Sequence, residues 1–129
     1  MMRGMIDHFS INCSDLDAAK KFYDTVLGVL GHRRLMDFDV AVGYGTEMPS
    51  FWLSSMEDIG PNREVHIAFT APDAATVRAF YEAALSLGAE SLHEPRIWPE
   101  YHDHYYGAFV RDPDGNNVEA VCHRAGPDD

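Results

Sequence analysis

Two histidines and one glutamate stand where their side chains could share a metal ion. His8 and His66 each lie in a short stretch that alternates apolar and polar residues, and Glu119 lies in a third such stretch. Alternation with period two predicts half-buried strands, with all three side chains on the face opposite the apolar one. Two neutral imidazoles and one carboxylate suit Fe(II), Mn(II), Zn(II) or Ni(II), and they leave coordination positions open for a substrate. The pattern therefore predicts a catalytic divalent metal site.

The elements that must position these side chains come from an internal repeat. An offset of 58 residues places His8 on His66 without a gap, and it aligns four further identical residues within residues 8–27. These pairs are Asp15 with Asp73, Phe22 with Phe80, Tyr23 with Tyr81, and Leu27 with Leu85. In both copies apolar residues then recur at helical spacing, after Ser14, which resembles a capping residue, and after Pro72-Asp73. Each copy therefore predicts a strand followed by a helix.

Three short extended segments follow each predicted helix. They cover about 33–38, 40–45 and 50–55 in the first copy, and about 91–96, 105–111 and 116–122 in the second. The sequence thus predicts an α+β fold in which two paired βαβββ modules form a cupped mixed sheet. We expect a single domain over residues 1–129, with modules at about 5–57 and 63–123, because neither half alone could bury a sufficient core.

Each of the three chemical residues also has a structural interpretation when it is considered alone. A histidine on a strand often only makes a hydrogen bond, and a glutamate at a sheet edge can be solvated. Burying Glu119 among Val118, Ala120 and Val121 is unfavourable unless a partner or a cation compensates its charge. The shared face of the carboxylate and two repeat-equivalent histidines therefore favours the metal site.

The composition disfavours several classes of partner. A formal net charge of −11 argues against nucleic acid and against an anionic membrane surface. No apolar run approaches the roughly 18 residues of a spanning helix, and the first eight residues show no secretory signal. The two cysteines, Cys13 and Cys122, are expected to be buried thiols on the helix-facing sides of their strands. We therefore expect a cytoplasmic protein.

Motifs along nearly the whole chain resemble the vicinal oxygen chelate superfamily. This superfamily includes glyoxalase I, bleomycin-resistance proteins, fosfomycin-resistance transferases and extradiol dioxygenases. The motifs are His8–Asn12, Ser14–Leu16, Phe22-Tyr23, Leu27-Gly28, Val65–Phe69 and Asp112–Glu119. The resemblance implies a cupped sheet of paired βαβββ modules, often in a homodimer, with a divalent metal in the cup.

The resemblance also assigns the metal ligands by position. In this superfamily the ligands come from the first and last strands of the modules, and His8, His66 and Glu119 occupy such positions. Both single-chain sites and sites formed across a swapped dimer occur in the superfamily, and the sequence leaves this choice open.

The fourth ligand position departs from glyoxalase I, which supplies a carboxylate there. An offset of 67 residues aligns the last strands of the two copies and places Trp52 on Glu119. The chain thus resembles the three-ligand transferases and dioxygenases, and Trp52 becomes a candidate substrate contact. The two offsets differ by nine residues, which predicts an insertion within Pro95–His104.

The predicted insertion carries further candidate functional residues. His102, His104 and Tyr106 could move a proton, with Tyr106 expected to point into the cup. Arg96 and Tyr105 are candidate substrate contacts. The alternative interpretation is an aromatic surface loop with solvated histidines.

These features together predict a metal-dependent enzyme, either lyase- or isomerase-like or dioxygenase-like, that binds a small oxygen-bearing substrate. The alternative is a metal-free protein that sequesters a cationic drug, which the net charge of −11 favours electrostatically. A third interpretation is a degenerate member that only forms dimers.

Overall fold

Two βαβββ modules follow one another along the chain in the computed structural model, which describes residues 5–56 and 59–129. The first module contains β1 (Phe9–Cys13), α1 (Leu16–Val29), β2 (Arg33–Asp37), β3 (Ala41–Gly45) and β4 (Pro49–Ser55). The second contains β5 (His66–Thr70), α2 (Ala74–Ser86), β6 (Ser91–Ile97), β7 (Tyr106–Arg111) and β8 (Asn117–Cys122). The predicted α+β fold of two paired modules is confirmed. The expected end of the first module, residue 57, lies outside the described residues.

Each module has its own four-stranded mixed sheet, with strand orders β1-β4-β3-β2 and β5-β8-β7-β6. In both sheets the first strand runs parallel to the last, and the other pairs are antiparallel. β1 and β5 are edge strands, and within the described ranges no strand pairing joins the two sheets. The predicted pairing of two modules is therefore present in a single chain, but as two separate four-stranded sheets rather than one cupped sheet.

The strand register confirms the predicted equivalence of Trp52 and Glu119. Trp52 stands opposite Ser10 in β1, and Glu119 stands opposite Ala68 in β5. Ser10 and Ala68 are 58 residues apart, as the repeat requires. The connection between β2 and β3 spans residues 38–40, whereas that between β6 and β7 spans residues 98–105. The insertion therefore lies in the second module, as predicted, but at residues 98–105, because Pro95–Ile97 belong to β6. We call residues 98–105 the inserted loop.

Both helices have an aspartate as their N-cap, whereas the sequence suggested Ser14 for the first helix and Pro72-Asp73 for the start of the second. The side chain of Asp15 accepts a hydrogen bond from the Ala18 backbone N–H, and Asp73 does the same for Thr76. The prediction of Ser14 as the cap is thus wrong by one residue. The Ser14 hydroxyl instead donates to Asp114 at 2.5 Å, which links the two modules.

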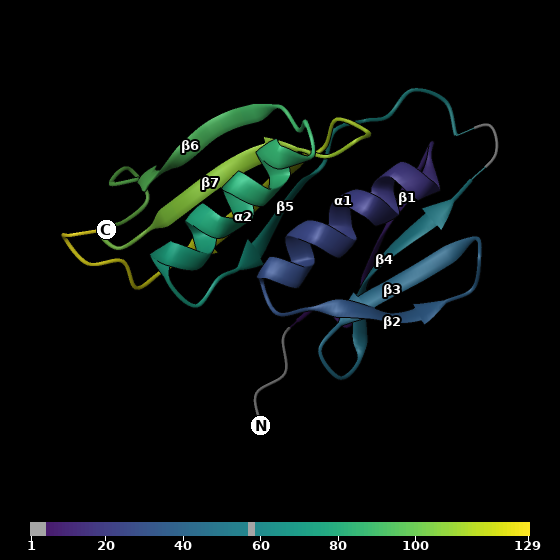
Figure 1. Ribbon diagram of the computed structural model, residues 1–129, viewed down its shortest axis with the longest axis horizontal. Helices are drawn as coiled ribbons and strands as arrows, with labels where there is room; N and C mark the ends of the chain where they lie inside the picture. The colour runs from purple at the N-terminus through teal and green to yellow at the C-terminus, as the bar shows by residue number, and fades with distance from the viewer. Residues whose placement is uncertain (1–4, 57–58) are drawn as a thin grey trace.

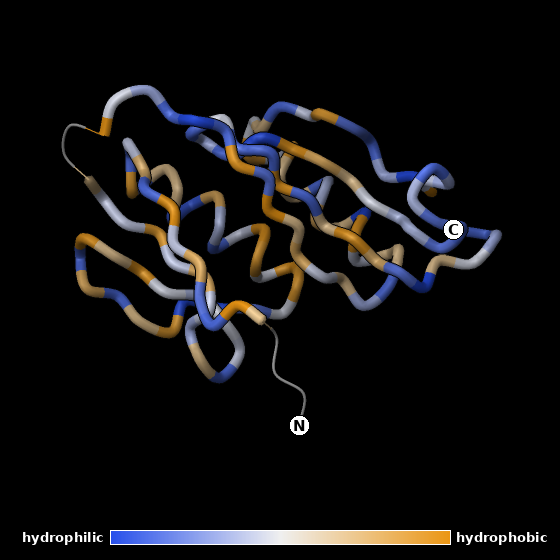
Figure 2. The backbone as a smooth tube through the Cα atoms, turned by 180° about the vertical axis from the view of Figure 1, so that it is seen from behind, coloured by the Kyte–Doolittle hydropathy of each residue, from blue (hydrophilic) through white to orange (hydrophobic). Residues whose placement is uncertain are grey.

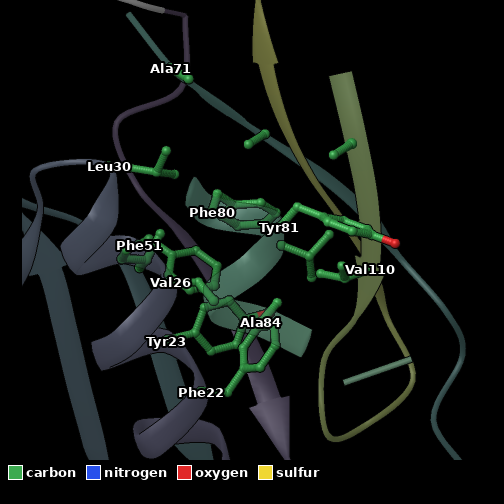
Figure 3. Close-up of a cluster of buried hydrophobic side chains, with 14 of the residues drawn as sticks. Phe22, Tyr23, Val26, Leu30, Phe51, Ala71, Phe80, Tyr81, Ala84 and Val110 are labelled. Carbon is green, nitrogen blue, oxygen red and sulfur yellow. The ribbon is translucent and has the colours of Figure 1, made fainter. Parts of the chain in front are cut away.

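The two helices pack against each other and join the modules into one hydrophobic core (Figure 1). Figure 3 shows side chains of α1 and α2 facing one another in this core. Its labelled helix residues are Phe22, Tyr23, Val26, Phe80, Tyr81 and Ala84. Phe51 of β4 also meets Phe69 of β5 edge-on, with ring centroids 5.2 Å apart. Because each fully buried large apolar side chain contributes roughly 1.5–3 kcal/mol, this shared core holds the modules together.

A buried carboxylate, Asp112, adds a polar link between the modules. Tyr23 of α1 donates its hydroxyl hydrogen to Oδ2 of Asp112 at 2.6 Å. Asn116 donates to the same carboxylate through its side chain at 3.0 Å and through its backbone N–H at 2.9 Å. Burial and the nearby Asp112 raise the pKa of Tyr23 well above its usual value, so the phenol stays a donor.

The strands present two different faces, and the alternation of hydropathy along the backbone is visible in Figure 2. We call the side of each sheet away from its helix the outer face. Cys13 and Cys122 lie on the helix side and are buried thiols, as predicted. Neither helix in the described ranges has the length and apolar character that crossing a membrane requires.

Candidate functional site

His66 and Glu119 meet on the outer face of the second sheet. Their neighbours Val118 and Ala120 point into the core, so Glu119 points the opposite way. Nε2 of His66 donates to Oε1 of Glu119 at 2.8 Å. The glutamate is only 1% exposed, whereas the histidine side chain is 51% exposed. A carboxylate this deeply buried requires close partners, and His66 is one of them.

Tyr105 supplies the second partner of this carboxylate. Its hydroxyl donates to Oε2, so the two carboxylate oxygens of Glu119 have different donors. Burial and this hydrogen bond raise the pKa of Tyr105, which keeps the phenol neutral and able to donate. Phe109 stands directly opposite Glu119 in the β7–β8 pair, and its ring centroid is 5.7 Å from that of His66. The carboxylate is therefore enclosed by two aromatic rings and an imidazole.

Gly107 makes room for this arrangement. A Cβ atom at Gly107 would lie 3.0 Å from Oε2 of Glu119 and 3.2 Å from Cε1 of Tyr105. Any larger residue would therefore push the phenol or the carboxylate aside. This role of Gly107 was not predicted from the sequence, although the alternation of Tyr105, Gly107 and Phe109 at the start of β7 is its signal.

Tyr106, a predicted catalytic residue, lies on the opposite face of the same strand. It is buried in the hydrophobic core, where its hydroxyl accepts a hydrogen bond from Arg78 at 3.2 Å. The expectation that Tyr106 points into the cup is wrong, because Tyr106 pairs with the buried Cys122 and Phe109 takes the place opposite Glu119. A shift of one residue in a hairpin register turns every side chain to the other face.

His102 and His104, the other two predicted catalytic residues, tie the inserted loop to the chain end. Nδ1 of His102 accepts from the His104 backbone N–H at 3.0 Å, so its Nε2 is the donor to Nδ1 of His123 at 2.9 Å. His104 donates through its own Nδ1 to the carbonyl of Ala125 at 2.9 Å. The rings of His102 and His123 pack edge-on against Tyr105. The imidazole rings of His102 and His123 therefore support the ring of Tyr105. No pattern in the sequence distinguished His123.

Arg96, a predicted substrate contact, lies near the end of β6 and contacts residues that follow this strand. Its guanidinium lies 3.4 Å from the ring centroid of Trp98 and pairs with Glu100 at 3.4 Å. Its Nη1 also donates to the carbonyl of Ile97 at 2.7 Å. These contacts restrain the guanidinium beside the inserted loop.

The remaining predicted residues, His8 and Trp52, lie on the first module. His8 is exposed, and its Nδ1 is 2.8 Å from a carboxylate oxygen of Asp7. It lines an open hollow of about 400 Å³ together with Trp52, Met36 and Met48. The Trp52 ring is half-buried and stacks on that of Phe38, with centroids 6.1 Å apart. The hollow is therefore an apolar surface with a histidine at its side.

One chain thus brings together two of the three predicted metal ligands. Within residues 5–56 and 59–129, no group of three or more His, Cys, Asp or Glu side chains could hold a metal ion. An imidazole nitrogen beside a carboxylate oxygen is nevertheless a pair of metal ligands that suits borderline divalent metals. His66 and Glu119 therefore supply two ligands of a metal site, and His8 of the same chain does not join them.

The comparisons with known proteins agree with this architecture. The sequence model of the family described as "Glyoxalase/Bleomycin resistance protein/Dioxygenase superfamily" matches residues 5–120. A glyoxalase/bleomycin resistance protein from Albidiferax ferrireducens T118 is 27% identical, with a TM-score of 0.82 over 92% of this chain and 99% of that chain.

Two more distant structures share the fold. A lactoylglutathione lyase from Agrobacterium tumefaciens is 23% identical, with a TM-score of 0.69 over 93% of this chain and 94% of that chain. The fosfomycin resistance protein FosX from Mesorhizobium loti is 19% identical, with a TM-score of 0.66 over 95% and 93% of the two chains. Among curated proteins, none matches the sequence significantly.

Proposed function

Because this chain belongs to the glyoxalase/bleomycin resistance protein/dioxygenase superfamily, we propose that it is a metal-dependent enzyme acting on a small oxygen-bearing molecule. The contact between His66 and the buried Glu119 carries this proposal. An imidazole and a carboxylate held side by side on an open sheet face can bind Fe, Mn, Zn or Ni ions. The cost of burying the carboxylate is consistent with a functional role, since an apolar residue would suit a purely structural position better.

We propose that His8 of a second copy completes the ligand set, in a homodimer. Three observations support this arrangement. His8 is exposed on the first module, the edge strands β1 and β5 are each paired on one side only, and the first module exposes a cluster of large apolar side chains. These side chains are Met36, Phe38, Val40 and Met48. An unpaired strand edge and an exposed apolar surface are each typical of a protein interface.

The residues of the chain would divide the work as follows. A divalent ion, when bound, supplies a Lewis acid for substrate oxygens. His66 must then present an unprotonated Nε2 and carry its proton on Nδ1. Phe109 and Tyr105 exclude water from Glu119, and the second copy, which brings its hollow beside Trp52 together with His8, offers apolar surface to the carbon part of a substrate. Proton transfer by His102 or His104 stays a prediction, as do substrate contacts by Trp52, Arg96 and Tyr105 and a cytoplasmic location.

Mixing two defective variants tests both the metal site and its shared construction. His8→Ala and His66→Ala proteins, purified without a polyhistidine tag, are titrated with Co²⁺ by calorimetry, first separately and then after subunit exchange. Each variant alone should bind at least about tenfold more weakly than the wild type. The exchanged mixture should regain high-affinity binding at about one quarter of the wild-type stoichiometry, because half of the dimers would hold one intact site.

Other outcomes would contradict the proposal in separate ways. No high-affinity binding by the wild-type protein would refute the metal-dependent enzyme. Tight binding by the wild type with no recovery in the mixture would place all ligands within one chain.

A second candidate function is metal-free sequestration of a cationic drug. The net charge of −11 and the half-buried Trp52, stacked on Phe38, are features that attract a flat cation. Titration with bleomycin in the presence of a chelator tests this candidate. Micromolar binding that is lost in Trp52→Ala would support it, and no binding would exclude this drug as the ligand.

A further inference from the structure

We propose that Tyr105 is a positioning residue for Glu119, an inference that rests on the proposed metal site. Glu119 is almost fully buried, with His66 on Oε1 and the Tyr105 hydroxyl on Oε2. Tyr105 thus fixes the orientation of the carboxylate. It leaves Oε1 as the oxygen that faces the imidazole, while Oε2 is already satisfied.

The inserted loop holds Tyr105 itself in a defined place. The backbone N–H of Trp98 donates to the Tyr105 carbonyl at 2.8 Å, and the backbone N–H of Tyr105 donates to the His102 carbonyl at 3.3 Å. Its ring packs against Tyr101, with centroids 4.8 Å apart, and edge-on against His102 and His123. Both the backbone and the ring of Tyr105 are therefore restrained before any ligand arrives.

This support has a chemical consequence for the carboxylate. A glutamate with two free oxygens can rotate and can offer both of them to one ion. Holding Oε2 on a neutral phenol favours coordination through Oε1 alone, which keeps a further position on the ion open to a substrate. Residues that orient a ligand in this way typically change metal affinity by about 10- to 100-fold when they are removed.

The test removes the Tyr105 hydroxyl and keeps the ring. Tyr105→Phe is compared with Tyr101→Phe, a matched change on the more exposed neighbouring ring of the same loop. Co²⁺ affinity is measured by calorimetry, and the visible absorption of bound Co²⁺ reports the ligand geometry. Tyr105→Phe should weaken Co²⁺ binding by about 10- to 100-fold and change the Co²⁺ spectrum. Tyr101→Phe should leave both within about twofold of the wild type.

Failure of this inference differs from failure of the metal site. If the wild type binds Co²⁺ tightly and Tyr105→Phe has the same affinity and spectrum, Tyr105 does not position the ligand, but the metal site stands. If the wild type does not bind Co²⁺, both proposals fall.

A second variant keeps the inference testable if Tyr105→Phe does not fold. Gly107→Ala retains the phenol but places a methyl group against both Tyr105 and Glu119. It should also weaken Co²⁺ binding and alter the spectrum, whereas unchanged binding would overturn the inference.

Discussion

Trp52 and Glu119 occupy the same position in the two modules, opposite Ser10 and Ala68. Glu119 is buried between His66 and Tyr105, which donate to its two oxygens. Trp52 instead stacks on Phe38 and lines an open apolar hollow. The same strand position therefore holds a buried carboxylate in one module and an aromatic ring in the other, because the residues around each position differ.

The glycines beside these two positions follow the same logic. A Cβ at Gly43 would come within 2.9 Å of the Trp52 ring, and a Cβ at Gly107 would meet Glu119 and Tyr105. In each module a glycine on the neighbouring strand leaves room for an aromatic ring, and in the second module also for the carboxylate of Glu119. The outer faces of the two modules thus differ although their strands are arranged alike.

The largest effect on Co²⁺ affinity should come from replacing Glu119, the charged residue of the equivalent positions Trp52 and Glu119. Glu119→Gln replaces a charged carboxylate ligand with a neutral amide and should weaken Co²⁺ binding by more than the roughly 100-fold typical of a supporting residue. Trp52→Ala removes only apolar surface and should change the affinity by less than about threefold. Calorimetry on both variants checks this, and equal losses would show that the two modules are not divided in the proposed way.

The next effect compares the equivalent tyrosines of the two helices. Tyr23 donates across the module boundary to the buried Asp112 at 2.6 Å, whereas Tyr81 shares a hydrogen bond with Ser91 of its own module at 2.7 Å. Tyr23→Phe should cost about 2 kcal/mol of unfolding free energy, and Tyr81→Phe about 1 kcal/mol, since hydrogen bonds to carboxylates are stronger. Urea unfolding measures both. A larger loss in Tyr81→Phe would contradict the role of Asp112 as the link.

A smaller, pH-dependent effect is expected at the second helix cap. Hydrogen bonds from the Thr76 side chain and backbone lower the pKa of Asp73. A carboxyl whose folded pKa is lowered contributes stability above its unfolded pKa, near 4, and loses it as the pH falls through the folded value. The difference in melting temperature between wild type and Asp73→Asn should therefore shrink from pH 6 to about pH 3. Thr76→Val should reduce this pH dependence. A difference in melting temperature between wild type and Asp73→Asn that stays constant with pH would contradict the stabilising role of the Asp73 carboxylate.

The smallest effect concerns the stability of the protein at alkaline pH and the buried thiol of Cys13 in the first module. Burial, with the charges of Asp114 and Asp112, raises the pKa of Cys13 to about 12. A thiol with a raised folded pKa contributes stability below its unfolded value, near 9, and loses it as the pH rises toward about 12. The loss of unfolding free energy between about pH 8 and pH 10.5 should therefore be smaller in Cys13→Ala than in wild type. An equal loss would mean that other groups govern alkaline unfolding.

The sequence predicted those features of the fold that depend on repeated patterns. The offset between His8 and His66, and that between Trp52 and Glu119, rest on alternation and on helical spacing, which strand pairing preserves. The buried thiols followed from the same alternation. These predictions hold because a strand facing a core has only one favourable register.

The inserted loop was less predictable, because its conformation rests on individual contacts. Whether Tyr105 or Tyr106 faces Glu119 depends on one residue of register in the β7–β8 hairpin. The pairing of His102 with His123 joins residues that no periodicity relates. Similarly, Ser14 and Asp15 are both good helix caps, and the contact of Ser14 with Asp114 belongs to the tertiary structure.

The backbone hydrogen bond between Trp98 and Tyr105 holds the two ends of the inserted loop next to each other. Residues between such closely spaced ends can be added, removed or replaced without altering the register of the strands that flank them. Replacing this segment while keeping Tyr101 and His102, which pack on Tyr105, therefore offers a route to altered selectivity with the strand register unchanged.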